Sequence, residues 1–87
     1  MRGDVYDIMC NNIKYILEDK VRGRVKTLYA KDYDTLIVEI YPDYITDKFR
    51  ASYRCITTSI MQGSNSNDLA NSVLRLYKNW VRKKIFI

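Results

Sequence analysis

Residues 33–41 constrain the fold more than any other segment, because they form the most hydrophobic run in the chain. They read Tyr-Asp-Thr-Leu-Ile-Val-Glu-Ile-Tyr, and this richness in β-branched and aromatic side chains predicts a β-strand. Pro42 follows, and since proline cannot donate a hydrogen bond to a sheet, we expect the strand to end there. Alternate residues of a strand point to opposite faces. Leu36, Val38 and Ile40 therefore predict one fully apolar face on which helices can pack.

Two further strands are predicted on either side of this one. Residues 24–30 form the first, and the pattern leaves open whether Leu28 or Tyr29 faces inward. Residues 31–34, Lys-Asp-Tyr-Asp, are a polar turn that would join the first two strands as a hairpin. Residues 48–58 form the third strand, whose register is fixed by a strict alternation: Phe49, Ala51, Tyr53 and Cys55 alternate with Arg50, Ser52 and Arg54.

Helices are predicted at both ends of the chain from apolar residues at spacings of three and four. The first covers residues 4–21, with Asp4 as its N-cap and Gly23 just beyond its end. Residues 62–67 form a loop, and Ser66 or Asn67 would cap the second helix. The apolar stripes are Val5, Ile8, Met9, Ile13, Ile16 and Leu17 in the first helix, and Leu69, Val73, Leu76, Tyr77 and Trp80 in the second.

The predicted order is therefore α-β-β-β-α, within a single domain covering residues 1–87. We expect an α+β two-layer sandwich, in which both helices pack on one face of a three-stranded antiparallel meander. One core should form from both layers: Ile13, Ile16, Leu17, Leu36, Val38, Ile40, Phe49, Tyr53, Val73, Leu76 and Trp80.

The composition argues against several classes of enzyme and metal site. The chain has two cysteines and no histidine, so it cannot alone supply the four Cys or His ligands of a structural zinc site, nor a Ser-His-Asp or Cys-His catalytic centre. The acid pairs Glu18-Asp19 and Asp32/Asp34 lack the geometry of a shared site. We therefore expect no catalytic residues, no metal and no cofactor. Cys10 and Cys55 are expected to be buried thiols.

The charge of the chain is unevenly distributed. Residues 1–47 carry a net charge of −2, whereas residues 48–87 carry eight basic residues and one acid, for a net charge of +7. Such asymmetry indicates a cationic surface and an anionic partner. The alternative is that the charge serves only solubility.

The second helix carries the clearest cluster of cations. Arg75, Lys78 and Arg82 are spaced i, i+3 and i+7, so they share one ridge, and Lys83 and Lys84 extend it at the C-terminal end. A ridge of this kind can contact phosphates in the salt-dependent manner of nucleic-acid binding. The alternative is a solvated helix face whose cations are favoured near the helix C-terminus.

The uncovered face of the sheet is a second candidate surface. Arg50 and Arg54 would flank Glu39 and Tyr41, and arginines beside a tyrosine can stack nucleic-acid bases. The alternative is a cross-strand pair between Glu39 and an arginine, contributing at most ~1 kcal/mol. Several tyrosines are expected at the periphery, where tyrosine is typical of protein interfaces: Tyr6, Tyr33, Tyr41 and Tyr44.

The predicted order of elements is that of the double-stranded RNA-binding domain, but the motifs with which that family contacts RNA are missing. The family has Gly-Pro-x-His between its first two strands, where residues 31–34 read Lys-Asp-Tyr-Asp. It opens its second helix with Lys-Lys-x-Ala-Lys, where residues 67–71 read Asn-Asp-Leu-Ala-Asn. The function of that family is therefore not expected here.

Residues 67–78, which read Asn-Asp-Leu-Ala-Asn-Ser-Val-Leu-Arg-Leu-Tyr-Lys, and residues 83–86, Lys-Lys-Ile-Phe, resemble the C-terminal helix of small uncharacterised proteins from Firmicute phages and mobile elements. The size and layout are also similar to some anti-CRISPR inhibitors. This resemblance implies a stoichiometric inhibitor or adaptor that docks on a host protein or ribonucleoprotein complex in the bacterial cytoplasm.

Two functions are therefore expected, both without catalysis. The first is an inhibitor or adaptor that docks on a nucleic-acid-handling host complex, and the second is a free DNA- or RNA-binding module that uses the basic C-terminal half. The partner-binding residues would be Arg75, Lys78, Arg82, Lys83, Arg50 and Arg54. No run of about 20 apolar residues predicts a membrane span, and the first residues do not form the apolar core of a signal peptide.

Overall fold

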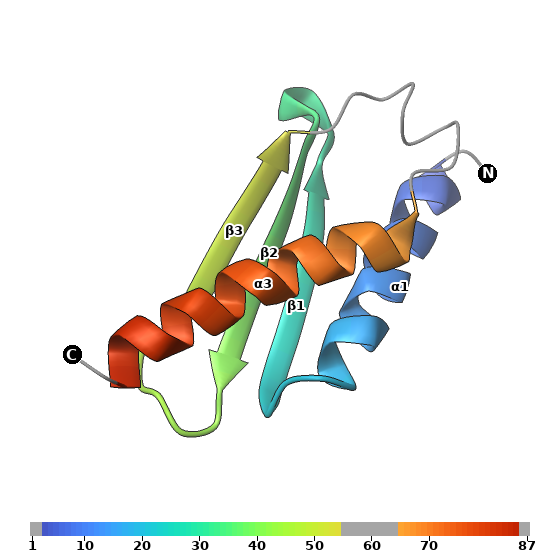
Figure 1. The fold of residues 1–87 in the computed structure, drawn as a ribbon. Coiled ribbons are helices and arrows are strands. Elements are labelled where there is room, and N and C mark those ends of the chain that lie inside the picture. The colour runs from blue at the N-terminus through green and yellow to red at the C-terminus, as the bar shows by residue number, and fades with distance from the viewer. Residues whose placement is uncertain (1–2, 55–64, 86–87) are drawn as a thin grey trace.

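The chain folds into a three-stranded antiparallel sheet covered on one face by two helices (Figure 1). The computed structural model describes residues 3–54 and 65–85. The elements are α1 (Gly3–Glu18), β1 (Gly23–Ala30), the 3-10 turn η1 (Lys31–Tyr33), β2 (Thr35–Pro42), β3 (Phe49–Arg54) and α3 (Ser66–Ile85). The predicted α+β class and the α-β-β-β-α order are confirmed.

β2 is the central strand, as its hydrophobicity predicted, and the sheet order is β1-β2-β3. Leu36, Val38 and Ile40 are fully buried on the face that the helices cover. At the centre of the sheet, Val38 pairs with Thr27 of β1 and with Ala51 of β3. Pro42 is the last residue of the strand, where its lack of an N–H does no harm to the ladder.

The helical layer completes the core from the side of the sheet that carries those three residues. α3 crosses the sheet obliquely and α1 lies along β1 (Figure 1). Ile13 and Leu17 of α1 and Val73 of α3 are fully buried against the sheet. Ile16, Tyr53 and Trp80 are partly buried beside them. Most of the predicted core is therefore confirmed.

In the two outer strands, the buried side chains also point to the face of the sheet that the helices cover. Phe49 and Ala51 are buried, whereas Arg50 is exposed, so the alternation in β3 was interpreted correctly. In β1, Tyr29 faces the helices and Leu28 is 60% exposed on the other face, which resolves the alternative left open by the sequence. The predicted extension of the third strand through residues 55–58, with Cys55, lies outside the described residues.

α1 ends earlier than predicted. Its last helical residue is Glu18, and the N–H groups of Lys20 and Val21 then close a final turn onto the Leu17 carbonyl. Gly23 is not the helix stop but the first residue of β1. The helix begins at Gly3, so Asp4 lies in the first turn and is not the N-cap.

The cap of α3 was also predicted one residue too late. Asn65 precedes the helix, and its side-chain oxygen accepts a hydrogen bond from the N–H of Asn67 at 2.8 Å. This is the N-cap geometry, in which a side chain satisfies an N–H that has no partner within the helix. Ser66 and Asn67 are therefore the first two helical residues.

Two residues of the predicted apolar stripes lie outside the core. Ile8 is 58% exposed and Leu76 is 45% exposed, because each helix buries a narrower stripe than its apolar residues suggest. In α3 the buried residues are Ala70, Val73 and Tyr77, which places Leu76 on the flank of the helix. Tyr6, in contrast, is buried, so its predicted peripheral position was wrong.

Neither helix in the described part of the chain is long and apolar enough to cross a membrane.

Candidate functional site

The most accessible cluster of charge lies on the outer side of α3. Arg75, Lys78 and Arg82 are all exposed, because at 100° per residue they fall on the side of the helix opposite Val73 and Tyr77. We call these three residues the basic crest. With a rise of 1.5 Å per residue, the crest extends about 10 Å along the helix axis.

The crest differs from Lys48, Arg50 and Lys84 in having no carboxylate partner within the described residues. Within residues 3–54 and 65–85, the ion pairs involve Lys48 and Arg50 with Glu39, and Lys84 with Asp47 at 2.6 Å. None of the three crest residues forms an ion pair there. The charge of the crest therefore remains available to a ligand.

Two cations that the sequence did not assign to a site lie beside the crest. Lys20 and Arg22, in the turn after α1, line a depression of about 290 Å³ together with Lys78. The helix predicted over residues 4–21 would have placed Lys20 in its last turn and Arg22 directly after it, near the negative end of the helix dipole. Because α1 ends at Glu18, they instead extend the basic surface of α3 toward the end of the sheet.

Two tyrosines, Tyr44 and Tyr77, also line this depression. Arg22 lies over the Tyr44 ring, 5.8 Å from its centroid. The Tyr77 hydroxyl is buried and has no hydrogen-bond partner within the described residues. Burial raises the pKa of Tyr77, and the nearby Tyr44 hydroxyl adds to this rise. Tyr77 is therefore a neutral group of the core, and the charges that line this depression are those of Lys20, Arg22 and Lys78.

Arg50 and Arg54, the other two predicted site residues of the sheet, are not on the same surface as the crest. They project from the face of the sheet opposite the helices, as expected from the alternation in β3. Arg50 Nε lies 3.7 Å from Glu39 Oε2 across the β2–β3 register. The cross-strand pair that was the alternative to base stacking is therefore present.

Glu39 neutralises much of that sheet face. Its carboxylate accepts hydrogen bonds from Tyr41 Oη at 2.7 Å and from Lys48 Nζ at 3.0 Å. These two bonds, followed by the charges of Lys48 and Arg50, hold the pKa of Glu39 below its usual value. The carboxylate is thus a stable counter-charge for the cations around it.

Tyr41 itself is surrounded by cations. The guanidinium of Arg24 lies 5.2 Å from the ring centroid, and the ammonium groups of Lys26 and Lys48 lie 5.8 and 5.9 Å from it. These cation–π contacts occupy the ring faces that a nucleic-acid base would need for stacking. The geometry therefore does not favour the sheet face as a base-stacking platform.

Lys83 is separated from the crest although it follows Arg82 directly. It lies with Leu76, Asn79 and Trp80 on the flank of α3 that faces β3, and these residues line a groove of about 370 Å³ with residues 49–53. We call this depression the β3 groove. Arg50 also lines it, so the structure brings Lys83 and Arg50 together at the edge of the sheet and not on the crest.

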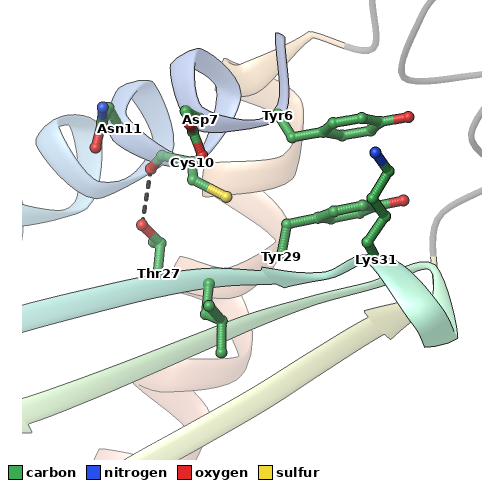
Figure 2. Close-up of a pocket in the computed structure, with 8 residues that line it drawn as sticks. Tyr6, Asp7, Cys10, Asn11, Thr27, Tyr29 and Lys31 are labelled. Atoms are coloured by element: carbon green, nitrogen blue, oxygen red, sulfur yellow. Dashed lines mark hydrogen bonds between the residues drawn. The ribbon is translucent and has the colours of Figure 1, made fainter. Parts of the chain in front are cut away.

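The opposite edge of the sheet has a groove of about 440 Å³ between α1 and β1, shown in Figure 2. Here the rings of Tyr6 and Tyr29 stack with centroids 4.4 Å apart, and the ammonium group of Lys31 lies 5.9 Å from the Tyr6 centroid. The Thr27 hydroxyl donates a hydrogen bond to the Cys10 carbonyl at 3.0 Å. These contacts tie α1 to the edge of β1, so we assign this groove a structural role.

The described residues contain no cluster of three or more Cys, Asp or Glu side chains able to hold a metal ion. Cys10 is a buried thiol, as predicted, and Cys55 lies outside the described range. Comparison with protein-family models, with curated proteins and with solved structures finds no match, so the function has to be argued from the geometry of the chain's own residues.

Proposed function

We propose that this protein is a non-enzymatic binding protein, an inhibitor or adaptor, that docks on a nucleic-acid-handling complex through the basic crest of α3. The observation that carries the proposal is the contrast between the cations. Lys48, Arg50 and Lys84 each have a carboxylate within 4 Å, whereas the crest has no such partner within the described residues.

The position of the crest supports this role. The crest stands on the outer side of a 20-residue helix that is fixed to the sheet by Val73 and Tyr77. Because the helix is held rigidly, its side chains are presented in a constant arrangement, and little backbone entropy is lost when a partner binds. Lys20 and Arg22 widen the same positive surface.

The spacing of the crest favours a second candidate, a free nucleic-acid-binding module. Cations spread over about 10 Å of a helix can contact successive phosphates of one strand, which are offset by about 3.4 Å along the duplex axis. In this case the affinity would not require a protein target. It would also fall steeply as salt increases, because binding releases counterions.

A salt titration separates the two functions. The protein is titrated with generic duplex DNA, single-stranded DNA and RNA at low and physiological salt, while the unmodified protein is used to capture partners from nuclease-treated extract of the source cells. An inhibitor or adaptor should retain a specific protein partner after nuclease treatment and bind the generic nucleic acids weakly. A free module should show the opposite.

A matched pair of variants shows whether the crest is responsible. Arg75, Lys78 and Arg82 are changed to Glu in one variant. In the control, the same change is made at Arg24, Lys26 and Lys31, which are exposed on β1 and η1. Loss of partner binding in the first variant alone supports the proposal. Equal loss in both shows that only the net charge matters, and no loss in either excludes the crest.

A further inference from the structure

The β3 groove runs along the edge of the sheet and not over one of its faces. Five consecutive residues of β3, from Phe49 to Tyr53, line it. Consecutive side chains of a strand point to opposite faces, so one groove can touch all five only if it follows the backbone. The groove is therefore bounded on one side by the edge of β3 and on the other by α3.

The backbone of β3 offers hydrogen bonds to this groove. β3 is the last strand in the order β1-β2-β3, and within the described residues it pairs with β2 alone. In an edge strand, alternate residues direct their N–H and C=O groups away from the sheet, and these groups can pair with another extended chain. The edge of β1 differs, because α1 packs far more extensively on β1 than α3 does on β3.

The helical wall of the groove has an apolar part, formed by Leu76 and Trp80, beside the polar Asn79 and Lys83. Leu76 is 45% exposed and lies beside Trp80, which is only partly buried. The Trp80 ring in turn lies 5.6 Å from that of Phe49, the first residue of β3. A strand added beside β3 would direct every second side chain toward this wall, so the wall selects an apolar residue at those positions.

The rim of the groove is cationic. Arg50 and Lys83 line it, although Arg50 also pairs with Glu39 at 3.7 Å, and Arg54 is exposed at the end of the same strand. Among the described residues, no Asp or Glu lines the groove.

The positive charge of the rim distinguishes between the ligands that could occupy the β3 groove. A second copy of the chain pairing edge to edge would bring its own Arg50, Arg54 and Lys83 against the same cations, and like charges directly opposite are destabilising. A nucleic acid would pair its phosphates with the cations, but its bases do not present the regularly alternating N–H and C=O groups that an edge strand requires. An acidic peptide chain matches both the charges and the backbone of β3.

We propose that the β3 groove binds an extended acidic segment of a partner protein, which adds to the sheet as a fourth strand beside β3 and places an apolar side chain against Leu76 and Trp80. This interaction uses a surface distinct from the basic crest. It therefore does not depend on the function proposed for the crest.

The only tryptophan of the chain lines the groove, so binding can be followed by the fluorescence of Trp80. The probe is a synthetic peptide that alternates valine and glutamate, with both ends blocked. Two further peptides carry N-methyl groups on the valines or on the glutamates. Because the wall fixes which residues face α3, only one alternate set of peptide N–H groups can face β3. One methylated peptide should therefore lose binding and the other should retain it.

Variants locate the site on the protein. Leu76→Ser combined with Lys83→Ala should weaken peptide binding at least about tenfold, since both an apolar contact and a charge are lost. The control is Lys78→Ala combined with Arg82→Ala on the crest, which should change binding by less than about twofold, as expected for charges away from the contact. Circular dichroism and thermal unfolding verify that each variant is folded.

Several results would overturn the inference. These are no binding of the acidic peptide, equal binding of a peptide with lysine in place of glutamate, equal binding of both methylated peptides, or equal effects of the two double variants. Dimerisation that the groove variant abolishes would assign the groove to a second copy instead. Failure of the crest variants in the nucleic-acid experiments would leave this result unaffected.

Discussion

Gly23 is the residue at which the chain passes from the turn after α1 into β1, and its backbone conformation favours glycine. Its φ is +150°, and a Cβ placed there would lie 2.2 Å from the carbonyl oxygen of Tyr41. The contact is with backbone, so it cannot be relieved by a change of rotamer. A non-glycine residue would therefore have to separate β1 from β2 at the start of the sheet.

Replacing Gly23 with alanine should consequently lower the free energy of unfolding by about 2 kcal/mol or more, the size of a backbone strain combined with a clash. Urea denaturation followed by circular dichroism measures the change. Gly3→Ala is the matched control, since Gly3 lies within α1, and alanine is favoured in helices. A Gly23→Ala protein as stable as the unmodified one would show that the β1–β2 pairing begins later.

Tyr77 is a second residue with a measurable consequence. Its hydroxyl is buried with no partner in the described part of the structure, and a buried polar group without a hydrogen bond is costly. Tyr77→Phe should therefore leave the free energy of unfolding unchanged or raise it by about 1 kcal/mol. Chemical denaturation at pH 7 tests this, and a clear loss of stability would mean that the hydroxyl does have a partner.

The raised pKa of Tyr77 also predicts a dependence on pH. The folded state holds the phenolic proton more tightly than the unfolded state does, so the stabilisation is complete below the ordinary tyrosine pKa of about 10 and is lost as the pH rises beyond it. Stability should therefore fall as the pH rises above about 10 toward the raised pKa of the folded state, and less steeply in Tyr77→Phe. Equal slopes in both proteins would contradict this.

At the scale of single elements, β2 is the strand on which both layers depend. Val38 is fully buried at its centre. Val38→Ala should reduce the free energy of unfolding by about 2–3 kcal/mol, as expected for a buried residue made smaller. Ile37→Ala, one residue earlier on the partly exposed face, is the control and should cost less. Equal costs would indicate that both faces of β2 are covered.

The sequence predicted the strands better than the helices, and the reason is geometric. A period of two gives each strand residue one of two directions, so Phe49 and Arg50 could be assigned to opposite faces without further information. The apolar stripe of a helix covers a wider range of directions, and which of its residues are buried depends on how the helix packs against the sheet. For this reason Leu76 was placed in the core and Ile8 in the apolar stripe of its helix, although both are exposed.

The candidate sites were less predictable because they depend on contacts between elements. A pair between Glu39 and an arginine was one of the alternatives from the sequence, but nothing there shows that Lys48 joins it. Nor does the sequence show that Lys83 turns toward β3 while Arg82 does not. Lys20 and Arg22 could not be assigned to the basic surface until the end of α1 was known. The spacing of Arg75, Lys78 and Arg82, in contrast, was sufficient to place them on one side of α3.

At the scale of the whole molecule, the charges of the crest should affect partner binding and hardly affect the stability of the fold. Reversing Arg75, Lys78 and Arg82 to Glu should change the free energy of unfolding by only about 0.5 kcal/mol per site, since all three are exposed. Partner binding should weaken about tenfold or more at low salt and less at high salt, because exposed charges are screened as ionic strength rises. Unchanged affinity at low salt would show that the crest is only a solvated face of α3.

The aromatic cluster between α3 and β3 has a consequence for how the molecule opens. The Phe49 ring lies 5.5 Å from that of Tyr77 and 5.6 Å from that of Trp80, so the first residue of β3 is anchored by two successive turns of α3. Neither segment can leave the sheet without exposing the rings of the other. Their backbone amides should therefore exchange with deuterium as one cooperative unit, and a strand bound at β3 should slow exchange in the C-terminal half of α3 as well.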